Sequence, residues 1–301
     1  MTVTRVRFPA LDGYSLGGFL HLGTNADPHH AVVFATGGGI RADVYRHFLS
    51  YLASYGMAVL AFDYRGIGES RPPRLRDFAA GFEDWAEYDA GGAIAWMAAR
   101  YPRACLTGMG HSIGALMIGA SEPARKFNQL ILIAPHTGYH GDYGPGLRWI
   151  VRLGWGVAGP PLRWLFGYFP ARILGLGEDL PRRVALQWGT HTLPEMKVGI
   201  DKGDRSREQR LLDQVANLRK PALVVSVADD PWATEYGVRR AVHAYRNLAV
   251  VRRVIDCPPS TQRCVGHWGF FRRSSAAALW PLVLQFIEPV APTTPRASAG
   301  A

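Results

Sequence analysis

The chain has 301 residues, of which 48% are hydrophobic and 19% are charged. These proportions are those of a globular protein and exclude a disordered, collagen-like or coiled-coil chain. The 34 Lys and Arg residues outnumber the 24 Asp and Glu residues, which gives a formal charge of +10. The basic residues are almost all arginines, some of them in scattered pairs, and no nucleic-acid-binding motif accompanies them. We therefore expect a solvated basic surface and no nucleic-acid partner.

The N-terminus and the cysteines indicate the compartment. Residues 1–22 contain no apolar stretch of signal-peptide length, and the chain has three cysteines, an odd number. Neither feature points to export or to a disulfide framework. We therefore expect a cytoplasmic protein.

The first part of the chain predicts strands joined by glycine-rich turns. Apolar residues alternate over residues 3–8 and 17–22 on either side of Asp12-Gly13, which predicts a β-hairpin. The apolar run 31–36 predicts a buried strand, and Gly37-Gly38-Gly39 follows it. Because glycines leave the main chain unobstructed, this loop suits one arm of an oxyanion hole, although a flexible turn would have the same sequence.

A helix over residues 42–55 leads to a strand that begins at Ala58 and continues into a glycine-punctuated loop ending at Ser70. Asp63 and Arg65 lie in this loop. We favour a structural role for both side chains, in which they hold the loop by hydrogen bonds, over a catalytic one.

Strands and helices continue to alternate up to residue 136. A long helix is predicted over 82–101, where Gly91-Gly92 indicates close packing against a neighbour, and strands are predicted over 104–109 and 130–134. Such alternation predicts an α/β fold with a mostly parallel sheet and helices on both faces. Ligands bind beyond the carboxyl ends of the strands in sheets of this kind.

The sequence Gly110-His111-Ser112-Ile113-Gly114 falls at one of these strand ends. The pattern Gly-x-Ser-x-Gly between a buried strand and a helix is typical of a nucleophile elbow, a sharp turn that exposes a serine. The two glycines remove side chains where neighbouring backbones come close. Ser112 is therefore the candidate nucleophile.

Residues 137–216 interrupt the sheet pattern with aromatic residues, glycines and prolines. An insertion of this length is too long for a plain loop, so we expect a mostly helical cap over the site whose aromatic face closes on an apolar substrate. Residues 147–169 resemble a membrane span, but three arginines and Pro160-Pro161 argue against one. We expect no membrane span and favour a cap over peripheral contact with lipid, which stays the minor alternative.

The sheet pattern resumes at residue 217, which gives core segments 1–136 and 217–289 around the insertion and a disordered tail over 290–301. The strand from Pro221 ends in Asp229-Asp230, and after one more strand His267 lies in a loop before a final helix over 274–287. The order serine, acid, histidine suits a catalytic triad. We favour Asp230 as the acid and keep Asp229 as its rival, and we expect the other carboxylate to cap the turn or the next helix.

These motifs together resemble the α/β-hydrolase superfamily over nearly the whole chain. The resemblance rests on the Asp12-Gly13 hairpin, residues 36–39, 63–70 and 110–114, Asp229-Asp230-Pro231 and Gly266-His267. More narrowly, residues 168–170, 177–181, 187–188 and 266–272 are similar to bacterial predicted hydrolases labelled serine aminopeptidase-like, or S33-like. This label describes sequence kinship and does not carry peptidase activity with it. Where the family often has His-Gly in the first oxyanion loop, this chain has Thr36-Gly37.

The resemblance implies a serine hydrolase that cleaves an ester, thioester or amide of a small-to-medium apolar substrate through an acyl-serine. Ser112 would attack, His267 would take its proton, Asp230 would orient the histidine, and the N–H groups of Gly38 and Ile113 would bind the oxyanion. No metal or cofactor is expected. An acyltransferase using the same acyl-enzyme and a non-catalytic ligand-binding protein of this fold remain alternatives, and the sequence does not indicate an oligomeric state.

Overall fold

The computed structural model describes residues 1–24, 27–190, 205–256 and 264–287. One eight-stranded sheet runs through it in the order β1-β2-β4-β3-β5-β6-β9-β10. The strands of this sheet are β1 (Thr2–Pro9), β2 (Ser15–Leu22), β3 (His30–Ala35), β4 (Ala58–Phe62), β5 (Cys105–His111), β6 (Gln129–Ile133), β9 (Pro221–Val227) and β10 (Ala249–Ile255). β2 pairs antiparallel with β1 and β4, and the other pairs are parallel. The predicted mostly parallel sheet is confirmed.

The order of the strands fixes where a ligand can bind. The chain runs from β3 outward to β4 and then returns to the other side of β3 to form β5. Parallel sheets open a crevice beyond the carboxyl ends of the strands at such a reversal. The loop after β3 contains the three glycines and the turn after β5 contains Ser112, so both lie at this crevice.

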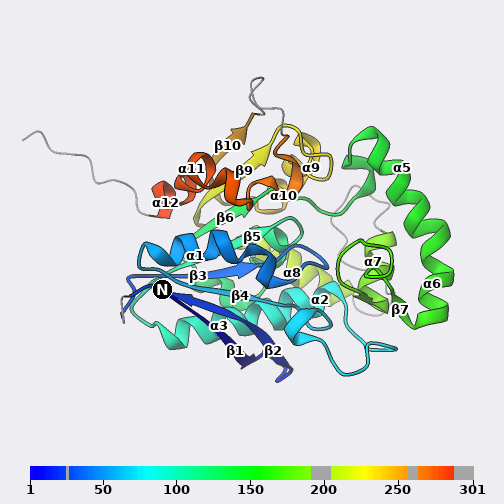
Figure 1. The fold of residues 1–301 in the computed structure, drawn as a ribbon, viewed down its shortest axis with the longest axis horizontal. Coiled ribbons are helices and arrows are strands. Elements are labelled where there is room, and N and C mark those ends of the chain that lie inside the picture. The colour runs from blue at the N-terminus through cyan, green and yellow to red at the C-terminus, as the bar shows by residue number, and fades with distance from the viewer. Residues whose placement is uncertain (25–26, 191–204, 257–263, 288–301) are drawn as a thin grey trace, which may run out of the picture.

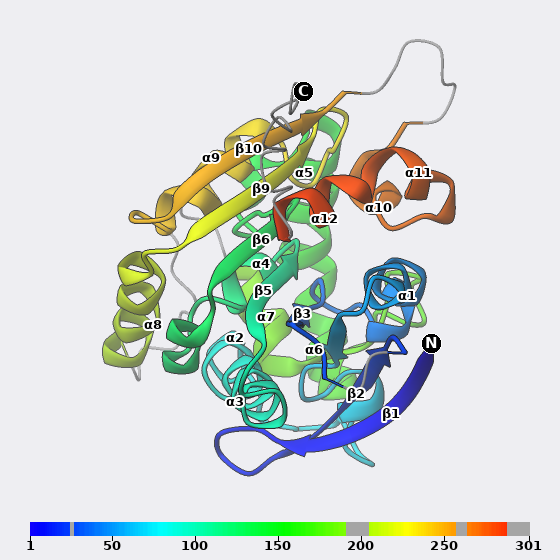
Figure 2. The same cartoon turned by 90° about the vertical axis from the view of Figure 1, so that its left-hand side faces the viewer.

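Helices cover both faces of the sheet, as the alternation of its buried side chains requires (Figure 2). In β3, Val33 faces one core cluster while Val32 and Phe34 face the other. The first cluster packs against α3 (Gly91–Arg100), α8 (Arg205–Asn217) and α9 (Glu235–Ala244), and the second against α1 (Arg46–Ser54) and α12 (Pro281–Ile287). Because the inner strands are buried on both sides, their sequences are mostly apolar.

Three predicted helices differ from regular α-helices. A 3₁₀ turn, Ala42–Tyr45, precedes α1, so residues 42–55 are only partly α-helical. The predicted helix 82–101 consists of α2 (Phe82–Asp84), a π-helical turn (Trp85–Ala90) and α3. A Cβ atom on Gly92 would lie 2.5 Å from the Ala10 backbone, so the predicted close packing is present. The predicted helix 274–287 is broken between α11 (Ala276–Leu279) and α12, where Pro281 has no N–H to donate.

In the segment 137–216, which we expected to form a cap, most of the residues that the structure describes are helical. It contains α5 (Pro145–Leu153), α6 (Gly159–Phe166), α7 (Arg182–Thr190), α8 and the short pair β7 (Tyr168–Phe169) and β8 (Leu180–Pro181). α5, α6 and α7 lie at one end of the sheet (Figure 1). None of the helices in the described ranges is long and apolar enough to cross a membrane. The tail 290–301, predicted to be disordered, lies outside the described residues.

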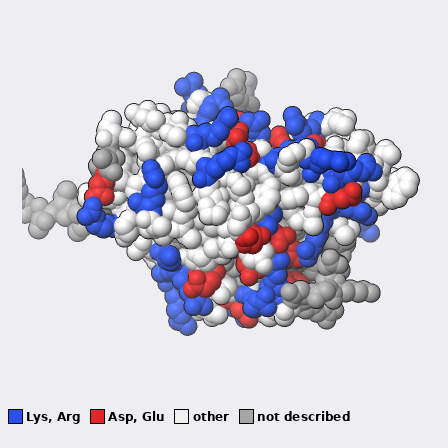
Figure 3. Space-filling view, turned by 90° about the horizontal axis from the view of Figure 1, so that it is seen from below, with Lys and Arg blue, Asp and Glu red and all other residues white. Residues whose placement is uncertain are grey.

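Basic and acidic side chains are interspersed on the face shown in Figure 3, where Lys and Arg lie in several groups with Asp and Glu among them. Many arginines are paired. Arg252 contacts Glu235 at 2.8 Å and Arg240 contacts Asp142 at 2.6 Å. Some of the basic side chains are therefore paired with carboxylates, whereas the net charge of +10 stays as it is.

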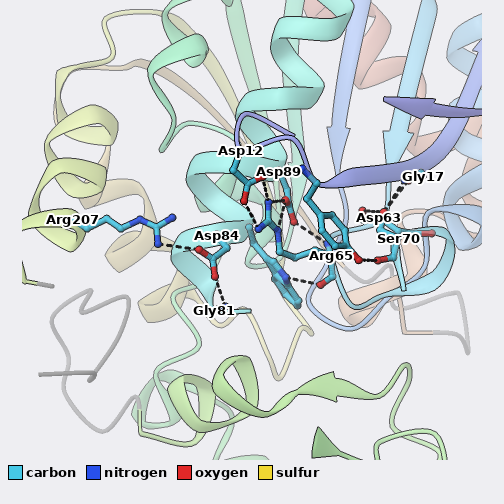
Figure 4. Close-up of polar contacts among 11 residues, drawn as sticks. Asp12, Gly17, Asp63, Arg65, Ser70, Gly81, Asp84, Asp89 and Arg207 are labelled. Atoms are coloured by element: carbon cyan, nitrogen blue, oxygen red, sulfur yellow. Dashed lines mark hydrogen bonds and ion pairs between the residues drawn. The ribbon is translucent and has the colours of Figure 1, made fainter. Parts of the chain in front are cut away.

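The loop after β4 is held by a buried polar network (Figure 4). The carboxylate of Asp63 accepts hydrogen bonds from the N–H groups of Ala42 at 2.7 Å and Glu69 at 2.8 Å. The Arg65 guanidinium donates to Asp12 in the hairpin turn and to Asp89 beside α3, each at 2.7 Å. These bonds tie the loop to three other parts of the chain, which is the structural role that we favoured for Asp63 and Arg65.

Asp63 makes the stability of the fold depend on pH. Burial raises its pKa to about 6, although the N–H groups of Glu69 and Ala42 oppose the shift. Between about pH 4 and pH 6 the unfolded chain releases this proton while the folded chain keeps it, so this carboxyl makes stability fall as the pH rises. The loss is on the order of 3 kcal/mol and is complete above pH 6.

We therefore expect Asp63→Asn to remove this part of the pH dependence. Urea unfolding followed by circular dichroism between pH 4 and pH 7 should show the wild type losing stability relative to the variant as the pH rises. Parallel profiles for the two proteins would mean that Asp63 titrates normally in the fold.

Candidate active site

Ser112 lies at the turn between β5 and α4 (Gly114–Met117) in a conformation that few non-glycine residues adopt. Its φ angle is +60°, in the left-handed region. A Cβ atom on Gly110 would lie 2.5 Å from the carbonyl oxygen of Gly114, and one on Gly114 would collide with the backbone of Thr36. Both glycines of the motif are thus required sterically, and the turn presents the serine at the crevice.

Three of the predicted site residues form one hydrogen-bonded chain. The Oγ atom of Ser112 lies 3.0 Å from Nε2 of His267, and Nδ1 of His267 lies 2.7 Å from Oδ2 of Asp230. Because a carboxylate only accepts hydrogen bonds, Nδ1 of His267 carries the proton and Nε2 accepts the one donated by Ser112. All three side chains are buried. The arrangement can move a proton from the serine to the histidine.

The structure separates the two adjacent aspartates. Asp230 accepts from His267 through Oδ2, and through Oδ1 from the N–H groups of Trp232 at 2.8 Å and Ala233 at 3.0 Å. Burial alone would raise the pKa of Asp230, but the hydrogen bond and charge of His267 and these N–H groups outweigh it, and the pKa lies below its ordinary value. The carboxyl is therefore ionised at neutral pH.

Asp229 contacts the histidine loop through the backbone. Its Oδ1 atom accepts from the N–H of Gly266 at 2.9 Å. Our expectation that the second aspartate caps the turn or the next helix is wrong, because Asp230 itself accepts from the N–H groups of that turn and Thr234 caps α9. The side chains of adjacent residues diverge, so Asp229 reaches the start of α10 (Gly266–Gly269) instead.

A second hydrogen-bonded chain connects the glycine loop, the elbow and the histidine loop. The N–H of Gly37 donates to the Tyr45 hydroxyl at 3.1 Å, and that hydroxyl lies 2.9 Å from Nδ1 of His111. Nε2 of His111 lies 3.0 Å from the carbonyl oxygen of His267. Since a carbonyl only accepts, His111 donates through Nε2 and accepts from Tyr45. Burial lowers the pKa of His111 well below its ordinary value, so the ring is neutral and fixes the spacing of the three loops.

The predicted oxyanion donors lie next to each other. A Cβ atom on Gly38 would be 3.2 Å from Cγ2 of Ile113 and 2.7 Å from the ring of Trp188. Among the hydrogen bonds recorded within the described ranges, none uses the N–H of Gly38 or of Ile113. The N–H of Gly37, by contrast, is already bonded to Tyr45.

His136 is a site residue that our sequence analysis missed. Its Nε2 atom lies 2.8 Å from Oγ of Ser112, and its side chain is buried. Its position in the sequence could have indicated it. His136 follows β6 as Ser112 follows β5, and β6 pairs with β5 in parallel, so both residues lie at the same edge of the sheet.

Aromatic residues of the segment 137–216 lie over the crevice. The ring of Trp188 stacks on that of Trp155 with centroids 5.8 Å apart, and the centroids of the Trp155 and Phe169 rings are 4.6 Å apart. Buried polar contacts fix this layer to the core, since Gln187 accepts from the N–H of Phe82 and donates to Glu83, each at 2.7 Å. The crevice is therefore bounded by aromatic surface.

An apolar pocket begins beside the elbow. It lies between the elbow, the helical segment 82–90 and α8, and its lining residues include Phe82, Ile113, Leu116, Ala120, Thr137 and Leu211. Ile113 and Thr137 directly follow Ser112 and His136 in the chain, so the pocket lies beside the residues of the hydrogen-bonded chain. Within the described ranges no three His, Cys, Asp or Glu side chains are grouped as a metal site would need.

Comparison with known families identifies the family of this chain. The model of the serine aminopeptidase S33 family matches residues 26–250, which is most of the chain. The chain belongs to this family. In this S33-family protein, Ser112 and Asp230 lie within the matched range, and His267 follows it.

Relatives of this S33-family protein include enzymes named for ester cleavage. It is 28% identical over 229 residues to a monoacylglycerol lipase of Mycolicibacterium smegmatis, a match that covers 64% of this chain and 78% of the lipase. It is also 37% identical over 71 residues to the esterase FrsA of Yersinia pestis, which covers 23% of this chain and 17% of the esterase.

Solved structures show the fold of this S33-family protein. An α/β-hydrolase from a Penicillium species aligns with a TM-score of 0.61 and 16% identity, covering 96% of this chain and 99% of that one. An esterase of Pyrococcus furiosus aligns with a TM-score of 0.59 and 17% identity, covering 95% and 90%. The protein is an α/β-hydrolase, as the sequence resemblance predicted.

Proposed function

We propose that this protein is a serine hydrolase that cleaves an ester, thioester or amide of a small-to-medium apolar substrate through an acyl-serine intermediate. The observation that carries this proposal is the chain from Asp230 through His267 to Ser112, with distances of 2.7 and 3.0 Å, on a serine at φ +60°. The relatives named as lipase and esterase support the same reaction class.

The first half of the proposed reaction acylates the serine. His267 takes the Ser112 proton on Nε2 as Oγ attacks the substrate carbonyl, and the ionised Asp230 stabilises the resulting imidazolium. The N–H groups of Gly38 and Ile113 receive the negative oxygen, and each such donor is typically worth about 10²- to 10³-fold in kcat. His267 then passes its proton to the leaving group.

The second half releases the acid. Water attacks the acyl carbon while His267 takes one of its protons, the bond between that carbon and Oγ breaks, and His267 returns the proton to Ser112. The aromatic layer over Gly38 limits the access of bulk water to this step, which strengthens the electrostatic interactions in the crevice.

This proposal is tested by trapping the intermediate. The purified enzyme is mixed with a p-nitrophenyl ester, quenched in acid within the first turnover, and analysed by intact-protein and peptide mass spectrometry. We expect one acyl group on the peptide that contains Ser112. Hydrolysis of the ester without any acyl-protein, or with the acyl group on another residue, would contradict the proposal.

The pocket beside Ile113 supports an apolar acyl group as the recognised part of the substrate. Ala120 lines this pocket, so Ala120→Phe fills part of it. We expect the variant to lose about tenfold or more in kcat/KM for a p-nitrophenyl octanoate relative to the acetate, because the longer chain loses its apolar contacts.

The size-matched control is Ala99→Phe, on the exposed side of α3. It should keep the wild-type preference between the two esters, which is measured from initial rates. An unchanged preference in Ala120→Phe would show that the acyl chain binds elsewhere.

A further inference from the structure

The Oγ atom of Ser112 has two histidine partners. Nε2 of His267 lies 3.0 Å away and Nε2 of His136 lies 2.8 Å away. A hydroxyl has one proton to donate and two lone pairs to accept with, so the two histidines cannot both accept from it. The Ser–His–Asp chain accounts for His267 only.

The hydrogen bonds of His136 decide its role. The N–H of Gly138 donates to Nδ1 of His136 at 2.9 Å. Nδ1 therefore carries no proton, and in the neutral ring the proton lies on Nε2, which points at Ser112. His136 donates a hydrogen bond to Oγ, while Ser112 donates its own proton to His267.

The backbone is shaped to hold His136 in this position. Ala134, two residues earlier, has a φ angle of +46°, and Ser112 and Ala134 are two of the three non-glycine residues with positive φ in the described ranges. Such strained conformations persist only where the surrounding structure imposes them, and they gather at functional sites. The ring of His136 is also packed against that of Tyr143, with centroids 5.8 Å apart, and its side chain is 2% exposed.

We propose that His136 is a further catalytic residue, which donates a hydrogen bond to Ser112 Oγ and assists the departure of this oxygen when the acyl-enzyme is hydrolysed. This inference rests on the proposed acyl-serine reaction. In that step the electron pair of the breaking bond between the acyl carbon and Oγ moves onto Oγ. The proton that neutralises it comes from His267, which took it from water. His136 keeps its own proton throughout and stabilises the negative charge as it develops.

The effect differs between the two halves of the reaction. Before acylation Oγ already accepts the hydrogen bond, so the charge that develops during attack strengthens an existing interaction only slightly. In the acyl-enzyme Oγ is an ester oxygen, a weaker acceptor, and the interaction becomes stronger as the bond breaks. The same donor also draws electrons from the ester and makes the acyl carbon a better target for water. His136 therefore accelerates deacylation more than acylation.

Two substitutions test the N–H donor at Nε2 of His136 separately from the rest of the side chain. His136→Asn keeps an oxygen where Nδ1 accepts from Gly138, but its side chain ends short of Ser112. His136→Gln can place an amide N–H near the position of Nε2. Hydrogen bonds to a charged acceptor are strong enough to change a rate about 10- to 100-fold.

The experiment follows the release of p-nitrophenol and the mass of the protein after rapid mixing with the ester that the wild type hydrolyses fastest. We expect His136→Asn to acylate within about threefold of the wild-type rate, to deacylate about 10- to 100-fold more slowly, and to accumulate acyl-enzyme. We expect His136→Gln to recover most of the deacylation rate.

Two results would overturn the role of His136. One is deacylation at the wild-type rate in His136→Asn, and the other is an equal fall of both rates in Asn and Gln variants with unchanged melting temperature, which would indicate positioning alone. Failure of the proposed function is distinguishable, because in that case the wild type itself forms no acyl group on Ser112.

Discussion

Ser112→Ala is expected to lower kcat for an activated ester by about 10⁴- to 10⁶-fold, the largest effect of any substitution in this chain. The Oγ atom of Ser112 lies just beyond the carboxyl end of β5 and donates its hydrogen bond to His267. Removing it leaves the backbone N–H groups and the pocket in place, so weak catalysis over water remains while the covalent route is lost.

The control for this substitution is Ser121→Ala. Ser121 is also buried, with 1% of its surface exposed, but the side-chain hydrogen bonds of Ser112 and His267 go to other residues. Initial rates and thermal unfolding should show a folded Ser112→Ala protein with kcat lower by about 10⁴-fold or more and a Ser121→Ala protein near the wild-type rate. Turnover close to the wild-type rate in Ser112→Ala would mean that another residue is the nucleophile.

The second large effect concerns the two aspartates. Asp230→Asn is expected to lower kcat by about 10⁴-fold, because an amide that donates to Nδ1 of His267 would hold the imidazole in the wrong tautomer. Asp229→Asn is expected to stay within about tenfold of the wild type, since its amide oxygen can still accept from the N–H of Gly266.

Steady-state rates of the two variants compare the acids directly, with the same chemical change at adjacent positions. A larger loss in Asp229→Asn than in Asp230→Asn would reverse the assignment. Equal losses of about 10⁴-fold would show that the loop holding His267 needs both carboxylates.

The sequence predicted the order of strands and helices because the inner strands are mostly apolar and the loops after β3, β4 and β5 contain glycines. Ser112 and His267 could be selected for the same reason, since their motifs are local. The choice between Asp229 and Asp230 stayed open because side-chain direction depends on the turn at Pro231, where Asp230 also accepts two backbone hydrogen bonds.

His136 illustrates what the sequence could not show. It lies 24 residues from Ser112, and its contact depends on the left-handed conformation of Ala134, which no residue pattern indicates for an alanine. The π-helical turn Trp85–Ala90 is of the same kind, because its side chains contact a loop distant in the sequence: Trp85 donates to the carbonyl oxygen of Arg65, and Asp89 accepts from the Arg65 guanidinium. Local sequence patterns predicted the elbow, whereas the contact between His136 and Ser112 can be seen only once β5 and β6 are paired in the sheet.

The most direct test of the central claim, that Ser112 is an activated nucleophile, is labelling with a fluorophosphonate followed by peptide mass spectrometry. The account predicts one adduct per chain on Ser112, no adduct in Ser112→Ala, and much slower labelling in Asp230→Asn than in Asp229→Asn. A folded wild-type protein that forms no adduct, or forms it on another residue, would contradict the account.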